Sequence, residues 1–216
     1  MKANNNETTR DLILQSAKYN FYHHGYKATT ISKIFSEIDV PAGIFTYYFK
    51  TKDMLVYEIY KSFFNNIDHF ILESYPNLKN SYFLKQAVLS KIYYQIILSD
   101  EKNASFYYQV LENKSNFRVN KHIIGPIFKN FIDEFNLVIP EEQFYLITIL
   151  DAGSRREFFL NYFKNHLTIS PYEISNLIEA LIPLMLRIDK NVVDSILLKS
   201  VGIANSLKYD HLVFLV

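Results

Sequence analysis

The sequence predicts an all-α protein with a small three-helix N-terminal domain and a larger helical C-terminal domain. Apolar residues recur three and four positions apart along most of the 216 residues, which is the spacing of one face of an α-helix. From residue 53 onward, glycine and proline are confined to a few positions. No β-hairpin pattern, in which two alternating apolar runs flank a short turn, occurs in the sequence.

The first helix is predicted over residues 10–24. Its apolar stripe consists of Ile13, Leu14, Ala17 and Phe21. Gly25 follows the stripe and is a natural C-terminal stop, because glycine readily adopts the left-handed backbone that often ends a helix.

Two short helices joined by a tight turn are predicted over about 29–48. Thr29 and Thr30 can cap the first of them, and Pro41 suits the first turn of the second. Their apolar faces consist of Ile31, Ile34, Phe35 and Ile38, and of Phe45, Tyr48 and Phe49. Asp39 and Val40 interrupt the apolar pattern between them. Helices this short are not stable alone, so all three are expected to pack as one unit.

This unit resembles the helix-turn-helix DNA-binding domain of the tetracycline-repressor (TetR/AcrR) family of bacterial transcriptional regulators. The resemblance covers the N-terminal quarter of the chain and is carried by Arg10, Ile13, Leu14, Ala17, Phe21, Gly25, Tyr26, Thr29, Thr30, Ile34, Val40, Gly43, Tyr48, Phe49, Lys52 and Leu55. It implies a DNA-binding domain over residues 1–60 and a regulatory, ligand-binding and dimerisation domain over residues 61–216. Four residues depart from the family pattern: Phe35 and Ile38 replace small residues, Asp39 replaces a glycine, and Pro41 replaces a serine cap. The glycine of the pattern implies a left-handed backbone at Asp39, which aspartate tolerates better than most residues.

The resemblance places the second short helix in the major groove of a double-stranded DNA operator. The residues expected to face the bases are Ala42, Gly43 and Thr46, and those expected to contact phosphates are Thr30, Tyr47, Tyr48 and Lys52, although Tyr48 could instead pack inward. Residues 41–49 contain no Arg, Lys, Asn or Gln, so the bidentate base contacts of strong direct readout are not available. Sequence preference is therefore expected from Thr46, from the Ala42 methyl group or from DNA shape.

Charge is distributed unevenly along the chain, although the net charge is only +1. Residues 1–52 hold seven Lys and Arg against four Asp and Glu, a balance of +3, and the rest holds sixteen against eighteen, a balance of −2. A mildly basic N-terminal unit is compatible with a DNA-facing surface. Ordinary surface variation explains the same asymmetry equally well.

The rest of the chain is predicted to form seven helices, over about 53–74, 80–98, 103–115, 118–136, 141–165, 171–187 and 190–207. Thr51 can cap the first of these, which would join the two domains. The clearest start is at Ser170, because a serine cap, Pro171 at the first helical position and Glu173 at the third complete a capping box.

The resemblance implies a homodimer formed by a four-helix bundle, to which each subunit contributes the helices over 141–165 and 171–187. The apolar residues available for this bundle are Leu146, Ile149, Leu150, Gly153, Leu160 and Phe163 on the first helix, and Ile174, Leu177, Ile178, Leu181, Ile182 and Met185 on the second. An apolar helix pair can also be core within one subunit. A pseudo-palindromic operator nevertheless favours a two-fold symmetric protein.

The resemblance also implies a small-molecule effector bound in the C-terminal domain. Candidate lining residues are Tyr93, Tyr94, Tyr107 and Phe131, in a chain with 17 Tyr and 18 Phe. Arg155 and Arg156 lie where apolar residues are expected, so they could hold an anionic ligand or form a salt bridge across the dimer. The alternatives are that the aromatic residues are simply core, and that one arginine is solvated while the other pairs with Glu157 or Asp151.

No catalytic residue, metal or cofactor is expected. The chain has no cysteine, and its six histidines accompany no HExxH motif, paired acid motif, nucleophile elbow or phosphate loop. The first residues resemble no signal peptide, and no apolar run reaches the ~20 residues of a membrane span, so a cytoplasmic protein without a membrane partner is expected. The competing hypothesis is an all-helical interaction protein or co-regulator whose degenerate DNA-binding unit binds a partner protein.

Overall fold

The computed structural model describes residues 8–113 and 129–216. Within these ranges the secondary structure is helical and no residue is in a strand, which confirms the all-α prediction. The helices are α1 (Thr9–Ala28), α2 (Ile31–Phe35), α3 (Phe45–Tyr48), α4 (Lys52–Ser74), α5 (Tyr82–Leu98), α6 (Glu101–Glu112), α8 (Glu141–Lys164), α9 (Pro171–Met185) and α10 (Lys190–Ser206), with 3-10 turns η1 (Ala42–Ile44) and η2 (Pro76–Asn80). Residues 129–134 are also helical.

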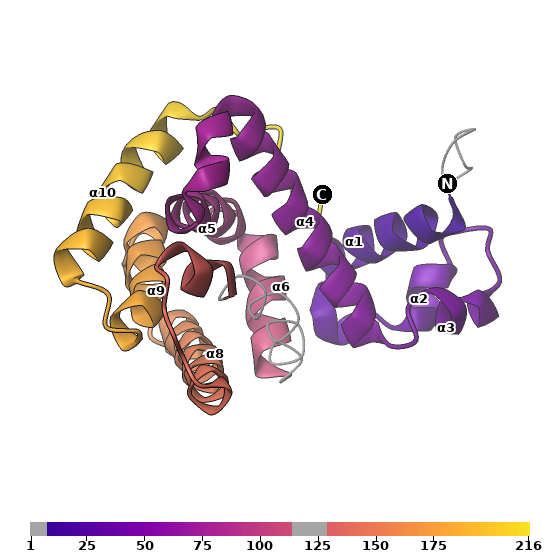
Figure 1. Ribbon diagram of the computed structural model, residues 1–216. Coiled ribbons are helices and arrows are strands. Elements are labelled where there is room, and N and C mark those ends of the chain that lie inside the picture. The colour runs from indigo at the N-terminus through magenta and orange to yellow at the C-terminus, as the bar shows by residue number, and fades with distance from the viewer. Residues whose placement is uncertain (1–7, 114–128) are drawn as a thin grey trace.

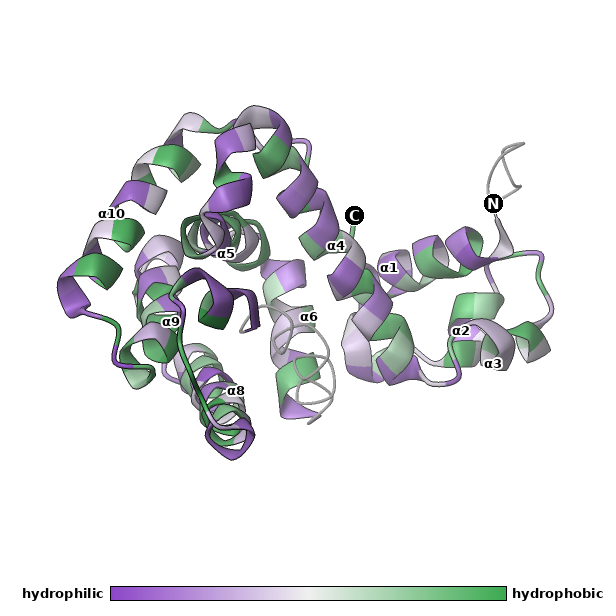
Figure 2. Cartoon of the chain, in the orientation of Figure 1, coloured by the Kyte–Doolittle hydropathy of each residue, from purple (hydrophilic) through white to green (hydrophobic). Residues whose placement is uncertain are grey.

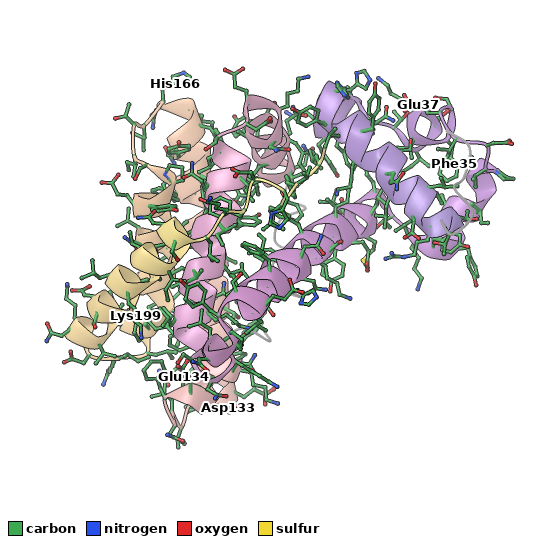
Figure 3. All side chains as sticks on the ribbon, turned by 90° about the horizontal axis from the view of Figure 1, so that it is seen from above. Phe35, Glu37, Asp133, Glu134, His166 and Lys199 are labelled. Carbon is green, nitrogen blue, oxygen red and sulfur yellow. The ribbon has the colours of Figure 1, made fainter. Side chains whose placement is uncertain are left out.

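One long helix joins a small group of helices to a larger one (Figure 1). The helices α1, α2 and α3 form the head, α5, α6, α8, α9 and α10 form the body, and α4 runs from the head along the body. The helix α6 lies on the side of the body that faces the head, where it packs against α1. Seen from above, the head carries Phe35 and Glu37, while Asp133 and Glu134 lie at the far end of the body (Figure 3).

The helix boundaries follow the capping signals in the sequence. Thr51 caps α4, because its hydroxyl accepts a hydrogen bond from the Met54 amide at 3.2 Å. Ser170 and Glu173 form the expected capping box at the start of α9. The predicted helices of the body therefore correspond to observed ones, except that residues 118–128 of the helix predicted over 118–136 lie outside the described part of the chain.

The turn between α2 and η1 differs from the prediction. Asp39 has no positive φ, so the expectation of a left-handed backbone there is wrong. The chain reverses over residues 36–40 instead, with a hydrogen bond from the Val40 amide to the Ile38 carbonyl at 2.9 Å, so no single residue is forced into that conformation. Pro41 lies just before η1 in an extended conformation, not in the first helical turn. The left-handed residue of this region is Lys50, with φ 57°, directly after α3.

The helix α5 is the centre of the body. Twelve of its 17 residues are buried, and it packs against α4, α6, α9 and α10. Figure 2 accordingly shows it as largely hydrophobic on a molecule whose outer helix faces are more polar. Its N-terminus is capped from a distant part of the chain, since the Phe83 amide donates a hydrogen bond to the Glu134 carboxylate at 2.7 Å. No described helix combines the length and apolar character needed to cross a membrane.

Candidate nucleic-acid interface and effector region

The two adjacent threonines at the start of α2 have different roles in the head. The Thr30 hydroxyl accepts a hydrogen bond from the Lys33 amide at 3.1 Å, so Thr30 is the helix cap. Thr29 is fully buried, and its hydroxyl donates to the Asn20 and Gly25 carbonyls at 3.1 and 2.8 Å. Thr29 therefore ties the end of α1 to the start of α2.

The helix α2 is also held along its length by α1. The Ser16 hydroxyl donates to the Ile34 carbonyl at 2.7 Å, and the Asn20 amide donates to the Glu37 carboxylate at 2.9 Å. Both donors are buried polar side chains of α1, whose partners offset the cost of removing them from water. The scaffold beneath the recognition segment is therefore fixed by side-chain hydrogen bonds as well as by apolar packing.

The recognition segment, residues 42–48, comprises η1 and α3. Phe45 and Phe49 are buried with their tilted rings 5.9 Å apart, and Phe35 of α2 meets Phe45 edge-on at 6.2 Å. These contacts turn the opposite side of the segment outward. The exposed residues there are Ala42, Gly43, Thr46 and Tyr47, of which Tyr47 is 79% exposed.

The other three predicted DNA contacts are placed differently. Thr30 is exposed beside the segment, and Tyr48 is half-buried against Phe49. The Lys52 ammonium donates a hydrogen bond to the Tyr26 carbonyl and lies 4.0 Å from the centre of the Tyr26 ring. Burial lowers the pKa of Lys52. Lys52 thus links α4 to the end of α1. Its contact with a DNA phosphate stays a prediction, and it would require the Lys52 ammonium to leave the Tyr26 carbonyl.

Two further cations flank the recognition segment and were not singled out from the sequence. Lys33 in α2 and Lys50 after α3 form no ion pair with a described residue. Arg10, by contrast, pairs with Glu58 at 2.5 Å, and Lys27 pairs with Glu112 at 2.8 Å. The sequence did not distinguish the two free lysines from the paired Arg10 and Lys27, because the acidic partners of that pair of residues lie in the distant helices α4 and α6.

The head therefore has the form of a helix-turn-helix domain. Two short helices are supported by a third, and the recognition segment has an outward face of small and hydroxyl side chains with unpaired lysines at its edges. Residues 13–59 match the model of the family described as bacterial regulatory proteins, tetR family. The head is therefore similar to the DNA-binding domain of TetR-family transcriptional regulators. None of the curated proteins and none of the solved structures matches it.

The head contacts the body through α6 as well as through α4. The Lys27 amide donates to the Gln109 side-chain oxygen at 3.0 Å, and the Tyr22 hydroxyl donates to the Asp100 carboxylate at 2.9 Å. Hydrogen bonds from Lys27 and Tyr108 lower the pKa of Glu112, which pairs with Lys27. The sequence reasoning named α4 as the link and missed α6, because no local pattern connects residues so far apart in the chain.

The predicted effector residues are divided between two parts of the body. Tyr93, Tyr94 and Tyr107 are buried in one aromatic cluster, with ring centres 5.0 Å apart for Tyr93 and Tyr94. Burial raises the pKa of Tyr94 to about 12. Phe131 lies in a second cluster, where it meets Phe83 at 4.7 Å. Phe131 therefore does not share a cluster with the three tyrosines.

The two predicted arginines have protein partners. The Arg155 guanidinium donates to both carboxylate oxygens of Asp151, at 2.8 and 2.7 Å, and to Glu179 at 3.3 Å. Asp151 is fully buried and Glu179 nearly so. Arg156 donates to the Leu111 carbonyl at 3.0 Å. The role of Arg155 as an anchor for an anionic ligand stays a prediction. The two acids that already pair with Arg155 would repel such a ligand.

Two pockets lined by described residues lie elsewhere in the body. One, of about 290 Å³, is formed by Leu98 with the end of α8 and the turn after it. The other, of about 460 Å³, lies between α5, α9, α10 and residues 207–212. Neither is lined by any of the six predicted effector residues. Within residues 8–113 and 129–216, no cluster of His, Cys, Asp or Glu could hold a metal ion.

The helices α8 and α9 expose apolar side chains to solvent. On these two helices the exposed large apolar residues are Tyr145, Leu146, Ile149, Leu150, Leu177 and Leu184. Others from the predicted bundle are buried within the monomer, namely Leu160, Ile174, Ile178 and Ile182. Each helix therefore turns one apolar side to its own subunit and leaves a second apolar side uncovered.

Proposed function

We propose that the chain is a homodimeric, cytoplasmic transcriptional repressor that binds a double-stranded DNA operator and releases it when a small molecule binds the body. The proposal assigns DNA binding to residues 1–60 and regulation, ligand binding and dimerisation to residues 61–216. The observation that carries it is the outward face of the recognition segment, where Ala42, Gly43, Thr46 and Tyr47 are exposed together on a head that matches the TetR family. Base readout is assigned to Ala42, Gly43 and Thr46.

Phosphate contacts are assigned to the polar residues around this face. Thr30, Tyr47, Tyr48 and Lys52 occupy the positions that the family resemblance indicates. The unpaired Lys33 and Lys50 add positive charge on either side of the segment. Because these residues would contact the DNA phosphates and not the bases, they would position the head without contributing to sequence preference.

Substitutions at Thr46 and Lys50 should separate the two kinds of contact. Thr46→Ala is expected to weaken binding to the preferred operator by about 1 kcal/mol and leave binding to random duplex unchanged. Lys50→Ala is expected to weaken binding to both duplexes equally and to lower the slope of log affinity against log salt by about one unit. Lys52→Ala should have the same effect on DNA and also lower the melting temperature, since it removes the bond to Tyr26. Fluorescence anisotropy at several salt concentrations measures all three.

The competing hypothesis is a co-regulator that binds a partner protein through a degenerate head. It is favoured by the lack of Arg, Lys, Asn and Gln in residues 41–49. A mobility-shift assay with DNA from the protein's own upstream region discriminates the two hypotheses. Salt-sensitive binding supports the repressor, and its absence from every fragment of the locus supports the co-regulator.

Dimerisation is assigned to the uncovered sides of α8 and α9. An operator with two half-sites requires two heads related by symmetry, and the exposed leucines of these helices provide an apolar surface for such an interface. The buried ion pair of Arg155 faces α9 of the same subunit, so the interface is expected to depend on apolar contact.

Gly153 offers a direct test of this interface. It is exposed on α8, and a side chain there would meet nothing within 4 Å in the monomer. Gly153→Leu is therefore expected to leave the monomer intact and to destabilise the dimer by about 1–3 kcal/mol through overpacking. Sedimentation velocity measures the dissociation constant. Gly202→Leu on α10, where the space is equally open, is the matched control and should not affect it. A wild-type protein that stays monomeric at micromolar concentration would contradict the assignment.

Release is assigned to a shift between two arrangements of the head and body. A ligand lowers operator occupancy only if it binds more tightly to the arrangement whose heads are badly spaced for DNA. The contacts of α6 with α1, through Gln109, Glu112 and Asp100, give the body a second connection to the head beside α4. A change in the body that moves α6 would therefore be transmitted to the recognition segment.

A further inference from the structure

The segment after α10, residues 207–216, returns across the body to the junction with the head. In Figure 1 it leaves the end of α10 and reaches α4 beside the head, where the C label stands. Phe214 is fully buried there and Leu215 nearly so. The Phe214 ring lies 5.2 Å from Tyr60 and 5.0 Å from Phe63, both on α4, and 5.9 Å from Phe106 on α6. Phe214 is thus a wedge between these two helices.

A single aromatic ring, that of Phe106, lies between Phe214 and helix α1 of the head. Phe106 lies 4.9 Å from Phe21 of α1, and Tyr60 lies 6.3 Å from Phe106. All four rings are buried in the same cluster. Packed interiors transmit displacements because they have few voids to absorb them. A shift of Phe214 would therefore move α4 and α6 relative to each other, and with them the support of α1.

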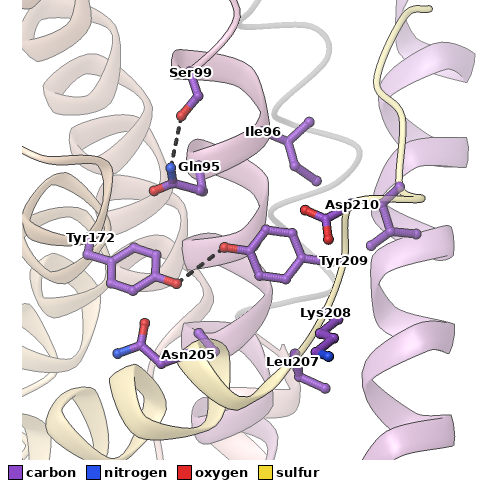
Figure 4. Close-up of a pocket in the computed structure, with 11 residues that line it drawn as sticks. Gln95, Ile96, Ser99, Tyr172, Asn205, Leu207, Lys208, Tyr209 and Asp210 are labelled. Carbon is purple, nitrogen blue, oxygen red and sulfur yellow. Dashed lines mark hydrogen bonds between the residues drawn. The ribbon is translucent and has the colours of Figure 1, made fainter.

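The other end of the same segment covers the larger pocket (Figure 4). Five of the eleven lining residues belong to it, and the rest come from α5, α9 and the end of α10. The volume of about 460 Å³ falls within the ~300–1,000 Å³ of typical ligand sites. A molecule in this pocket would contact Tyr209 and Leu212, and only one residue separates Leu212 from Phe214 along the chain.

The lining groups favour an uncharged ligand with several hydrogen-bonding groups. The hydroxyls of Tyr172 and Tyr209 point toward one another at 3.3 Å, which leaves each with further hydrogen-bonding capacity (Figure 4). The Asn205 side chain forms no hydrogen bond to another described residue. The charges of Lys208 and Asp210 balance, so the site carries no net charge for an ion to pair with. Burial and the bond to Tyr172 raise the pKa of Tyr209, so its hydroxyl stays protonated.

We propose that this pocket binds a small uncharged molecule rich in hydroxyl or amide groups, and that Phe214 transmits its occupancy to the junction of head and body. The site is separate from the aromatic cluster around Tyr93 and from Arg155. Its regulatory meaning rests on the proposed function, whereas its occupancy and its effect on the junction do not depend on DNA.

The chemical class of the ligand can be tested by disulfide capture, because the chain has no cysteine of its own. Asn205→Cys places one thiol in the pocket, and Leu198→Cys places one on α10 at a side chain that is 75% exposed. Each variant is equilibrated under mild reduction with disulfide fragments of equal length that end in hydroxyl or amide, carboxylate, or ammonium groups. Intact-mass measurement is expected to show several-fold preference for the hydroxyl and amide fragments at Asn205→Cys and none at Leu198→Cys. Equal capture at both positions, or preference for charged fragments, would overturn the proposal.

The transmission step is tested on the captured protein by hydrogen exchange. Occupancy at Asn205→Cys is expected to change amide exchange in residues 57–64 of α4 and 103–108 of α6. The change should diminish when Phe214→Leu is added and disappear with Phe214→Ala, while a hydroxyl fragment at Leu198→Cys should produce none. Phe214→Leu keeps most of the apolar volume, so the comparison stands if the alanine variant does not fold. An exchange response that is unchanged without the Phe214 ring would contradict transmission through the wedge.

Discussion

Arg155→Met is expected to lower the free energy of unfolding by about 3–5 kcal/mol, since it removes the cation from a buried ion pair. Asp151 is fully buried and would lose its positive partner, while Glu179, which is 8% exposed, would keep only the neighbouring charge of Lys91. Methionine fills much of the same volume, which limits the contribution of a cavity. The loss of stability would therefore arise mainly from the buried carboxylates that no longer face the Arg155 guanidinium. Urea unfolding followed by circular dichroism measures it.

A surface pair with the same spacing provides the control. Lys190 and Asp194 are also four residues apart on a helix, but their side chains are 73% and 54% exposed. Lys190→Met is expected to change stability by less than about 1 kcal/mol, because solvent screens the pair. A similarly small effect of Arg155→Met would contradict its structural role. If that variant kept its stability but lost a thermal-shift response to anionic compounds, Arg155 would be a ligand anchor after all.

The fold class and most helix boundaries could be predicted because their signals are local. Thr51 and Ser170 start helices through hydrogen bonds to backbone amides three residues ahead, and both caps occur as expected. The error at Asp39 has the same local origin. A family pattern with glycine at that position suggested a left-handed residue, but here the turn is spread over residues 36–40 and needs none.

The site could be predicted only as far as exposure follows periodicity. Thr46 and Tyr47 lie outside the apolar spacing of the recognition segment and are indeed exposed. Lys52 carries the positive charge expected at its position, yet its ammonium bonds to a backbone carbonyl, which has no signature in the sequence. Periodicity also could not assign the apolar residues of α9: Ile178 packs within the subunit, while Leu177 beside it is exposed.

Contacts between distant parts of the chain could not be predicted from the sequence, for a different reason. Gln109 bonds to the Lys27 amide, and Phe214 packs on Tyr60, but neither residue stands out from its neighbours in composition or spacing. Their roles depend on how α6 and the last segment are placed by the rest of the core. The link between head and body is therefore a property of the assembled fold.

Gly25→Ala is expected to weaken this link by about 2–4 kcal/mol. Gly25 has φ 76° and ψ 171°, a backbone region that is nearly exclusive to glycine, and alanine there costs about 1–3 kcal/mol. A Cβ atom would also lie 2.6 Å from the side-chain nitrogen of Gln109. Gln109 must then move, and its hydrogen bond to the Lys27 amide, worth about 1 kcal/mol, is lost. The free energy of unfolding in urea and the operator affinity should both fall.

Two comparisons separate the causes of this loss. Gly202→Ala lies inside α10 with nothing near the added Cβ, so it should stabilise the protein by about 0.5–1 kcal/mol through helix propensity. In a Gln109→Ala background the clash is absent, and Gly25→Ala should then cost only the backbone strain, so the two substitutions should be less than additive. If Gly25→Ala were as well tolerated as Gly202→Ala, α1 would continue as a regular helix through residue 25. The end of the head helix would then not be set by contact with α6.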